Sequence, residues 1–292
     1  MATTAAVTCS LHSGAAAWPE AQSACHSPVV RSPVVRTWPT SGGPTPLPDV
    51  PQEHRAHLND AADASARAPR GPSVRVEIWS DVVCPWCYIG KRRFATALAR
   101  FAHRDRVTVE WRSFELHPDA ESARLGDIVE PGDYGRRLAA KNGSELAAVQ
   151  QHLGLLTDAA RAEGLDVHFE RVQPANSFAA HRVLQLALAQ GVHEAAMERL
   201  FSGFFTSGEA IGDAVVLERL AGDVGLAGDD VRRALSDERY ADAVRADQAL
   251  ARELGIDAVP CFVIERQDGL RGAQHPEQLL ELLELNWRAG HG

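Results

Sequence analysis

The chain has 292 residues, of which 45% are hydrophobic and 24% are charged, and its formal net charge is −9. This length allows one large or two modest domains with a real hydrophobic core. The net negative charge disfavours binding to nucleic acid, and five cysteines are too few for a fold framed by disulfides. No stretch of about 18 apolar residues is present, so the sequence predicts no membrane span.

Residues 1–72 differ in composition from the rest of the chain. They hold ten of the 16 prolines and neither Phe nor Tyr. Such a segment cannot bury enough apolar surface to fold, so we expect a disordered, Pro- and Ala-rich N-terminal segment. The alternative is that the native start lies near Val74, where the globular pattern begins. Because the chain shows no secretory signal pattern, we expect a cytoplasmic protein.

The folded part opens with a β-α-β pattern. Residues 74–80 alternate apolar and polar side chains, which predicts a strand. A short turn leads to Pro85, after which Phe94 and Leu98 stand at helical spacing. Residues 106–114 alternate again and predict a second strand. This order is typical of the opening of an α/β fold.

The pattern then becomes helical over residues 118–240. Three apolar stripes at helical spacing support this expectation, at 146–156, 197–205 and 216–224. Asp213 precedes the third stripe and is a candidate N-cap. The aromatic residues of the second stripe are interpreted as core and not as a cofactor site.

The last segment returns to strands and ends in a helix. A strand is expected just after Pro260, with a hairpin partner at 270–272 across a turn at 267–269. His275 and Pro276 mark the start of the final helix. The sequence therefore predicts an α/β domain in two parts, 73–117 and 241–290, interrupted by a helical domain at 118–240.

The strongest chemical signal is Cys84-Pro85-Trp86-Cys87, at the junction of the first strand and the first helix. A helix N-terminus favours a thiolate over a thiol, and proline at the first helical position costs no hydrogen bond. Cys84 is thus expected to be the attacking thiol. Cys87 lies one turn further along, within reach to form a disulfide or to resolve a mixed one.

Other interpretations of the cysteine pair are weaker. Half a zinc site would need two more ligands at suitable spacing. Cys9 and Cys25 lie in the segment expected to be disordered, and Cys261 has no Cys or His close to it in the sequence. The pair is therefore interpreted as a redox site, with no metal and no organic cofactor.

Residues 74–287 resemble the DsbA-like branch of the thioredoxin superfamily, and its FrnE-like members most closely. Five segments carry the resemblance: VEIWSDVVCPWCYIGKRRF at 76–94, FELHPDA at 114–120, NSFAAHR at 176–182, AVPCFVI at 258–264 and GAQHPEQL at 272–279. The resemblance implies a thioredoxin fold with a large inserted all-helical domain. It also implies that Pro260 is cis and faces Cys84 across a substrate groove.

The resemblance extends to the residues that contact a substrate. In such proteins the backbone beside the cis-proline, here Val259, pairs with a bound peptide or with glutathione. Pro85 and Trp86, between the cysteines, are also expected at this groove. The helical domain of such proteins closes over the site, which makes Asn176 and His181 candidate ligands of the groove.

The implied activity is thiol–disulfide exchange with protein or low-molecular-weight thiol substrates. Glutathione is a plausible recycling partner, and the protein is expected to be a monomer or a homodimer that binds neither nucleic acid nor membrane. Compared with the periplasmic oxidant of this branch, Trp86 replaces a histidine that can stabilise the thiolate. We therefore expect a less oxidising pair.

Two alternative functions stay open. The 2-hydroxychromene-2-carboxylate isomerases and the kappa-class glutathione transferases resemble this pattern but carry Ser at the position of Cys84. Because this chain has Cys84 and keeps Cys87, exchange is preferred and a glutathione-dependent isomerase or transferase is the alternative. A redox-sensitive binding protein that holds unfolded clients is a third hypothesis.

A few residues near the motif carry weaker expectations. Cys261 is either a buried strand cysteine or a third redox thiol. Asp81 is expected to cap the turn before the helix. Lys91, Arg92 and Arg93 are most simply a solvated helix face, although they could attract the carboxylates of glutathione.

Overall fold

The computed structural model describes residues 73–290, except for 129 and 131. The expectation of disorder in residues 1–72 concerns residues outside the described part, as do Cys9 and Cys25. No described helix is both long enough and apolar enough to cross a membrane.

Four strands form one mixed sheet: β1 (Val74–Ser80), β2 (Val107–Ser113), β3 (Cys261–Ile264) and β4 (Asp268–Arg271). Their order is β2-β1-β3-β4. β1 runs parallel to β2 and antiparallel to β3, and β3 is antiparallel to β4. The two strands predicted at the start of the folded part are confirmed. Residues far apart in the sequence thus meet in the centre of the sheet.

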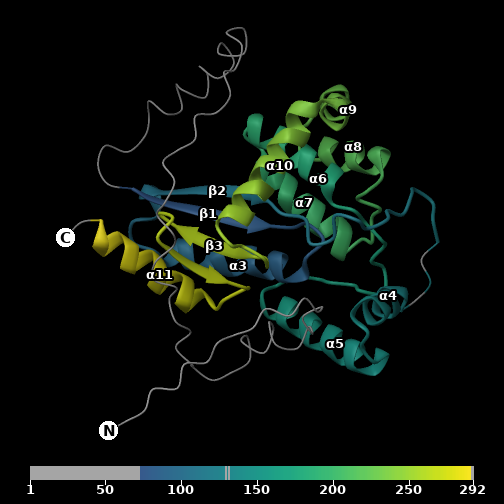
Figure 1. Ribbon diagram of the computed structural model, residues 1–292, viewed down its shortest axis with the longest axis horizontal. Coiled ribbons are helices and arrows are strands. Elements are labelled where there is room, and N and C mark those ends of the chain that lie inside the picture. The colour runs from purple at the N-terminus through teal and green to yellow at the C-terminus, as the bar shows by residue number, and fades with distance from the viewer. Residues whose placement is uncertain (1–72, 129, 131, 291–292) are drawn as a thin grey trace.

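Helices cover both faces of the sheet (Figure 1). On one face lie α3 (Pro85–Arg100) and α11 (Pro276–Ala289), and the ring of Phe94 in α3 stacks on Phe262 of β3 with centroids 5.6 Å apart. On the other face lies α10 (Glu238–Glu253), where the Asp247 carbonyl accepts a hydrogen bond from Trp79 Nε1 at 3.1 Å. Because side chains alternate along a strand, β1 contributes to both layers.

Between β2 and β3 the chain is helical, as expected. It forms α4 (Asp133–Asn142), α5 (Leu146–Ala162), α6 (Phe178–Ala189), α7 (His193–Phe205), α8 (Ala214–Gly222) and α9 (Gly228–Ser236) before α10. A short 3₁₀ turn, η3 (Arg104–Arg106), leads into β2. Figure 1 shows α6 to α10 gathered on one side of the sheet, while α4 and α5 lie together apart from them.

Most residues of the predicted apolar stripes are buried in the structure. The stripe of α7 is buried, and Asp213 caps α8 by accepting hydrogen bonds from the N–H groups of Val215 and Val216. In α5, Val149 and Leu156 are buried but Leu146 is 38% exposed. This stripe therefore begins one turn later than its sequence pattern suggests.

The position of the C-terminal hairpin turn was predicted wrongly. β4 begins at Asp268, so the turn lies at residues 265–267 and not at 267–269. Glu265 and Arg266 both adopt a positive φ of 52°. Because neither is Gly, Asn or Asp, their residue types gave no sign of a left-handed turn.

Candidate active site

Cys84 is the N-cap residue of α3, and Pro85 occupies the first helical position. The backbone N–H groups of Cys87 and Tyr88 donate hydrogen bonds to the Cys84 carbonyl, at 3.0 and 3.3 Å. The first turn of this helix carries no acidic side chain that would oppose a negative charge. Because N–H groups and the helix dipole stabilise an anion at this end, the position suits an attacking thiolate.

Cys87 lies one turn inside the helix and is 1% exposed. Both cysteines are free thiols. Burial raises the pKa of the Cys87 thiol well above its usual range, and the neighbouring Cys84 raises it further. The Asp81 N–H, 3.5 Å from Cys87 Sγ, and the Ser80 side chain act in the opposite direction. Cys87 is therefore a protonated thiol that must lose its proton before it can attack.

The segment before β3 faces Cys84. The Val259–Pro260 peptide bond is cis, and the Val259 carbonyl oxygen lies 3.7 Å from Cys84 Sγ. Gly90 of α3 allows this close packing, since a Cβ added there would lie 2.8 Å from Pro260 Cγ. Sequence analysis did not single out Gly90, although a glycine inside an amphipathic helix is a signal that could have found it.

A hollow of about 600 Å³ opens beside Val83, the residue before Cys84. Tyr134, Arg137 and Lys141 of α4 line it. Burial raises the pKa of Tyr134. The hollow thus lies next to the loop that carries Cys84. These residues of α4 were not predicted, because nothing in their local pattern indicates that they share a hollow with Val83.

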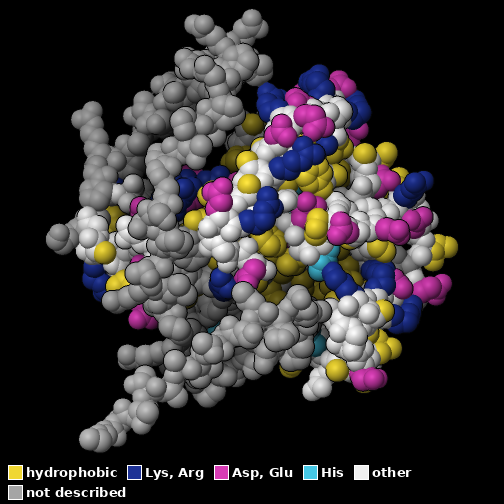
Figure 2. Space-filling view, viewed as in Figure 1, with side chains coloured by type: hydrophobic (Ala, Val, Ile, Leu, Met, Phe, Trp, Pro, Cys, Tyr) yellow, Lys and Arg dark blue, Asp and Glu magenta, His cyan; other side chains and the backbone are white. Residues whose placement is uncertain are grey.

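The basic side chains in the wall of the hollow already contact other residues of the protein. Arg137 forms an ion pair with Asp133, and Lys141 Nζ contacts His117 Nδ1. Burial lowers the pKa of Lys141, and burial together with the Lys141 charge lowers the pKa of His117. Figure 2 shows Lys and Arg side chains interleaved with Asp and Glu over the helical part. Attraction of an anion would therefore depend on these local groups and not on a broad basic field.

Asp81 does more than cap the turn. Its carboxylate is fully buried and accepts hydrogen bonds from the N–H groups of Val83 and Leu116, at 3.3 and 2.7 Å. His181 Nε2 of α6 lies 3.3 Å from Asp81 Oδ1 and 2.9 Å from the Phe114 carbonyl. This buried pair connects the helical region to the loop that carries Cys84.

Two of the predicted groove ligands have other surroundings. His181 is 2% exposed, so its side chain is enclosed by the protein. Asn176 lies just before α6 and connects this end of the helix to the segment around Pro118. Its side chain donates to the Pro118 carbonyl at 2.7 Å and accepts from the Phe178 N–H at 2.9 Å. Trp86 is half-buried, and its Nε1 has no hydrogen-bond partner among the described residues.

Cys261 lies in β3 and is 1% exposed. It pairs with Trp79 of β1, so its side chain shares the face of the sheet that α10 covers. Burial raises the pKa of its thiol to about 12, and the charged groups acting on it are those of Arg271 and Asp257. This environment is that of a buried strand cysteine.

The basic run in α3 is not the solvated face that was predicted. Arg93 is 7% exposed and donates to the Ala273 carbonyl at 2.6 Å and to Glu163 at 2.7 Å. Lys91 and Arg92 both form ion pairs with Glu198 of α7. The three cations therefore join separate parts of the chain, and their charges are already compensated.

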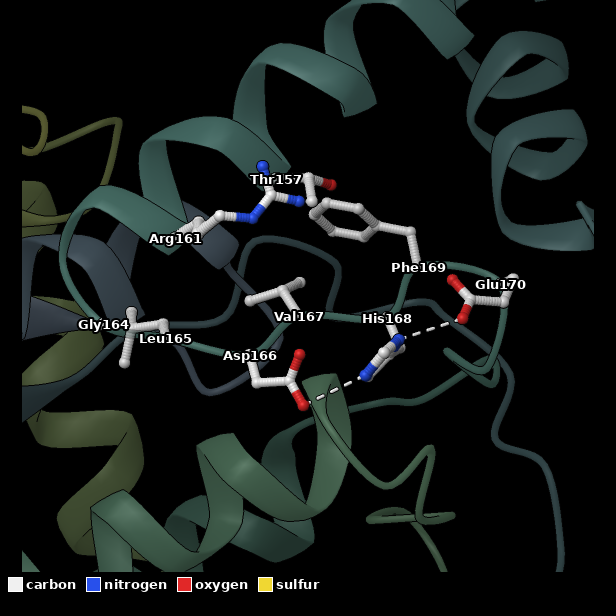
Figure 3. Close-up of a pocket in the computed structure, with 9 residues that line it drawn as sticks. All are labelled: Thr157, Arg161, Gly164, Leu165, Asp166, Val167, His168, Phe169 and Glu170. Carbon is white, nitrogen blue, oxygen red and sulfur yellow. Dashed lines mark hydrogen bonds and ion pairs between the residues drawn. The ribbon is translucent and has the colours of Figure 1, made fainter.

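A second hollow, of about 520 Å³, lies beside the C-terminal part of α5 (Figure 3). His168 sits there between Asp166 and Glu170, with 3.1 Å from each ring nitrogen to a carboxylate oxygen. No cysteine lines this hollow. Over residues 73–290, apart from 129 and 131, no group of three or more His, Cys, Asp or Glu is arranged to hold a metal ion. The cysteine pair is therefore the site taken up in the proposal below.

Comparison with known proteins agrees with this geometry. The model of the DSBA-like thioredoxin domain matches residues 75–284. The crystal structure of a probable DsbA oxidoreductase from Streptomyces coelicolor is 41% identical, covers 73% of this chain and 90% of its own, and has a TM-score of 0.67. The uncharacterized protein YwbO of Bacillus subtilis is 32% identical over 205 residues, 66% of this chain and 87% of YwbO.

A more distant structure shares the fold. The cytosolic disulfide reductase DsbM of Pseudomonas aeruginosa is 17% identical, covers 74% of this chain and 99% of its own, and has a TM-score of 0.50. The family match spans most of the described residues and accounts for the sheet, the helices on both of its faces and the helical insertion. The chain belongs to the family of proteins with a DSBA-like thioredoxin domain, and its fold is a thioredoxin fold with a helical insertion.

Proposed function

We propose that the protein is a thiol–disulfide oxidoreductase that works through Cys84 and Cys87. The observation that carries this proposal is the placement of Cys84 as N-cap of α3, with its Sγ 3.7 Å from the Val259 carbonyl and Cys87 one turn behind it. Membership of a family that includes a probable DsbA oxidoreductase supports it.

The proposed reaction has two steps. The Cys84 thiolate attacks one sulfur of a substrate disulfide, so that a bond forms to Cys84 and the other substrate sulfur leaves as a thiolate. Cys87 then loses its proton and attacks Cys84, which releases the second substrate thiolate. The substrate gains two electrons, and the enzyme keeps a disulfide between Cys84 and Cys87. The reverse sequence oxidises a dithiol.

We propose a disulfide-containing protein or a low-molecular-weight disulfide as the substrate, bound in the hollow beside Val83. Arg137 and Lys141 in its wall could attract the carboxylates of glutathione. The DsbM structure with glutathione supports glutathione as a recycling partner. No metal or organic cofactor enters the proposed chemistry. A cytoplasmic location, with reduction as the net direction, remains part of the proposal.

A redox equilibrium tests this function. The protein is equilibrated with glutathione buffers of stepped potential, alkylated, and its peptides are weighed. We expect a reversible two-electron transition that joins Cys84 to Cys87 and leaves Cys261 as a thiol. Cys261→Ala is the matched control and should show the same midpoint. Absence of the Cys84–Cys87 bond at every potential would overturn the proposal.

The second candidate is a glutathione-dependent isomerase or transferase. Two cations in the wall of the hollow, Arg137 and Lys141, and the deep burial of Cys87 favour it, since such a reaction needs glutathione bound near Cys84 but needs no second thiol. The two functions differ in their dependence on Cys87. Turnover that survives Cys87→Ala and needs glutathione would support the isomerase or transferase, whereas loss of turnover supports exchange.

A further inference from the structure

The segment at 114–118 follows β2 and forms one wall of the hollow beside Val83. Leu116, His117 and Pro118 line the hollow from this segment. The segment is neither helix nor strand. Backbone N–H and C=O groups outside regular structure need partners from side chains or water, so the position of this wall depends on the groups that bind its backbone.

Three polar side chains from other parts of the chain bind this backbone. His181 Nε2 lies 2.9 Å from the carbonyl of the first residue of 114–118. The Asp81 carboxylate accepts a hydrogen bond from the N–H of the third residue at 2.7 Å. The Asn176 side chain donates to the carbonyl of the last residue at 2.7 Å. The wall is therefore held at its start, its middle and its end.

We propose that Asp81, Asn176 and His181 are positioning residues for the attack by Cys84, because they fix the wall at 114–118 relative to the loop that carries this cysteine. None of the three has to touch the substrate. The inference rests on the proposed thiol–disulfide exchange, and it assigns to the first step of that reaction the residues that give the substrate site its shape.

Asp81 connects the wall to the cysteines. Its carboxylate is fully buried and accepts hydrogen bonds from the N–H groups of Val83 at 3.3 Å and Leu116 at 2.7 Å. Its backbone carbonyl accepts a hydrogen bond from the Cys84 N–H at 3.1 Å, and its own N–H lies 3.5 Å from Cys87 Sγ. One residue thus contacts the wall, the loop and both cysteines, so a shift of the wall against Asp81 would change the approach to Cys84.

His181 supplies a third hydrogen bond to the Asp81 carboxylate. Its Nε2 lies 3.3 Å from Asp81 Oδ1 as well as 2.9 Å from the Phe114 carbonyl, and both of these atoms are acceptors. Nε2 therefore carries the hydrogen and donates to the two oxygens. A buried carboxylate is costly unless donors surround it, so loss of this ring should loosen Asp81 and the start of the wall together.

Asn176 and His181 both belong to the N-terminal end of α6. The Asn176 side chain accepts a hydrogen bond at 2.9 Å from the N–H of Phe178, the first residue of the helix, while it donates to the Pro118 carbonyl. His181 lies about one turn further along the same helix. Because a helical turn is rigid, the start of α6 sets the distance between the two ends of the wall.

The position of the wall matters most for a substrate that fills the hollow. Besides Leu116 and Pro118, the lining includes Leu138 of α4 and Phe204 of α7, and the volume is about 600 Å³. An apolar side chain next to the substrate cysteine can be buried against these residues. A disulfide without such a side chain has less to contact there, so its reaction should depend less on the wall.

Two peptide disulfides that differ in one side chain test the positioning role. The probes are the symmetrical disulfides of N-acetyl-Phe-Cys-amide and N-acetyl-Gly-Cys-amide. Reduced protein is mixed with each probe over a range of concentrations, and the rate of the first thiol release is recorded. We expect the unaltered protein to react about tenfold more efficiently with the phenylalanine peptide, mainly through a lower half-saturating concentration.

Asn176→Asp removes one contact of the wall and keeps the start of α6. The new carboxylate can still accept from the Phe178 N–H but cannot donate to the Pro118 carbonyl. We expect the preference for the phenylalanine peptide to fall about two- to tenfold. His181→Phe should reduce the preference further, and His181→Gln, which keeps an N–H donor, should retain part of it.

Asn286→Ala is the matched control, because it removes the same kind of contact within α11. The Asn286 side chain donates to the Leu282 carbonyl at 3.0 Å and does not line the hollow. A general loss of stability would slow the reactions of both peptides, whereas a displaced wall lowers the ratio of their rates. This ratio should therefore be the same in the control as in the unaltered protein.

Amide hydrogen exchange gives a second measurement that needs no variant. In the unaltered protein the Leu116 N–H, which donates to Asp81, should exchange slowly although it lies outside any helix or strand. Rapid exchange at Leu116 would contradict a fixed wall.

Three results separate the positioning role from the function on which it rests. A preference that stays unchanged in folded Asn176→Asp and His181→Phe variants would overturn the positioning role. Equal efficiency with both peptides in the unaltered protein would also overturn it, because the hollow would then not receive the substrate side chain. Absence of thiol release with either peptide would overturn the proposed exchange function itself.

Discussion

Cys84 and Cys87 are one helical turn apart, and burial hardly distinguishes them, at 4% and 1% exposed. Their neighbours differ instead. Cys84 faces the Val259 carbonyl and lies beside a hollow of about 600 Å³, whereas Cys87 faces Ser80, Asp81 and the protein interior. The first cysteine is thus placed to meet a substrate, and the second to act on the first.

The largest expected effect comes from replacing each of the two cysteines by serine in separate variants. Cys84→Ser should reduce disulfide exchange to background, because no attacking thiolate remains at the helix N-terminus. Cys87→Ser should still attack but should accumulate a mixed disulfide on Cys84. Peptide masses after reaction with a substrate disulfide show which bond forms. Equal residual disulfide-exchange activity in the two variants would show that Cys84 and Cys87 do not have different roles.

The burial of His193 predicts that the free energy of unfolding depends on pH. Burial lowers the pKa of His193 from 6.5 to about 4, so the folded state binds fewer protons than the unfolded state between these pH values. Stability should therefore fall as pH drops from 6.5 towards 4, by up to roughly 3 kcal/mol from this group.

His193→Gln isolates that contribution. Urea unfolding at several pH values gives the slope of stability against pH, and the slope between 6.5 and 4 should be smaller in the variant than in the unaltered protein. The buried carboxylates contribute equally to both proteins and cancel in the comparison. Identical slopes would show that His193 is not held neutral.

A third test addresses the packing that brings Pro260 against α3. Gly90→Ala would place a Cβ 2.8 Å from Pro260 Cγ, so the segment facing Cys84 has to move. We expect a loss of about 1–3 kcal/mol in the free energy of unfolding, with slower attack by Cys84.

The matched control is Gly154→Ala in α5, where no atom other than the nearby backbone of α5 itself lies within 4 Å of the added Cβ. Because alanine has the higher helix propensity, this change should stabilise the protein by up to about 1 kcal/mol. Denaturant unfolding measures both variants. A neutral Gly90→Ala would mean that Pro260 tolerates displacement.

The smallest effect is expected at Cys261. Its thiol is 1% exposed and burial raises its pKa to about 12, so it should resist alkylation in the folded protein near pH 7. Cys261→Ala should leave exchange rates unchanged. Rapid labelling of Cys261, or slower exchange in the variant, would instead support the hypothesis of a third redox thiol.

The strand, turn and helix around the cysteines could be predicted because their signals are local. Alternation in residues 74–80 and Pro85 at the helix start mark β1 and α3 without reference to the rest of the chain. The motif position at the helix N-terminus follows from these two elements. The same reasoning failed at the hairpin turn, where Glu265 and Arg266 adopt a conformation that their residue types disfavour.

Features made by distant segments could not be predicted. Arg93 is held by Glu163, 70 residues away, and Lys91 by Glu198, 107 residues away, so a run of cations resembled a solvated face. A small cavity at the end of β1 is likewise lined by distant residues, Ser80 from β1 and His181 from α6. A single sequence shows which residues are polar but does not show which ones meet in the interior.

The order in which the two thiols react tests most directly the proposal that Cys84 attacks first and Cys87 then resolves the mixed disulfide. Reduced protein is mixed with one equivalent of oxidised glutathione, quenched at intervals and weighed as peptides. We expect a glutathione adduct on Cys84 that rises and then decays as the Cys84–Cys87 disulfide appears. A stable adduct on Cys84, or an adduct that forms first on Cys87, would contradict this proposal.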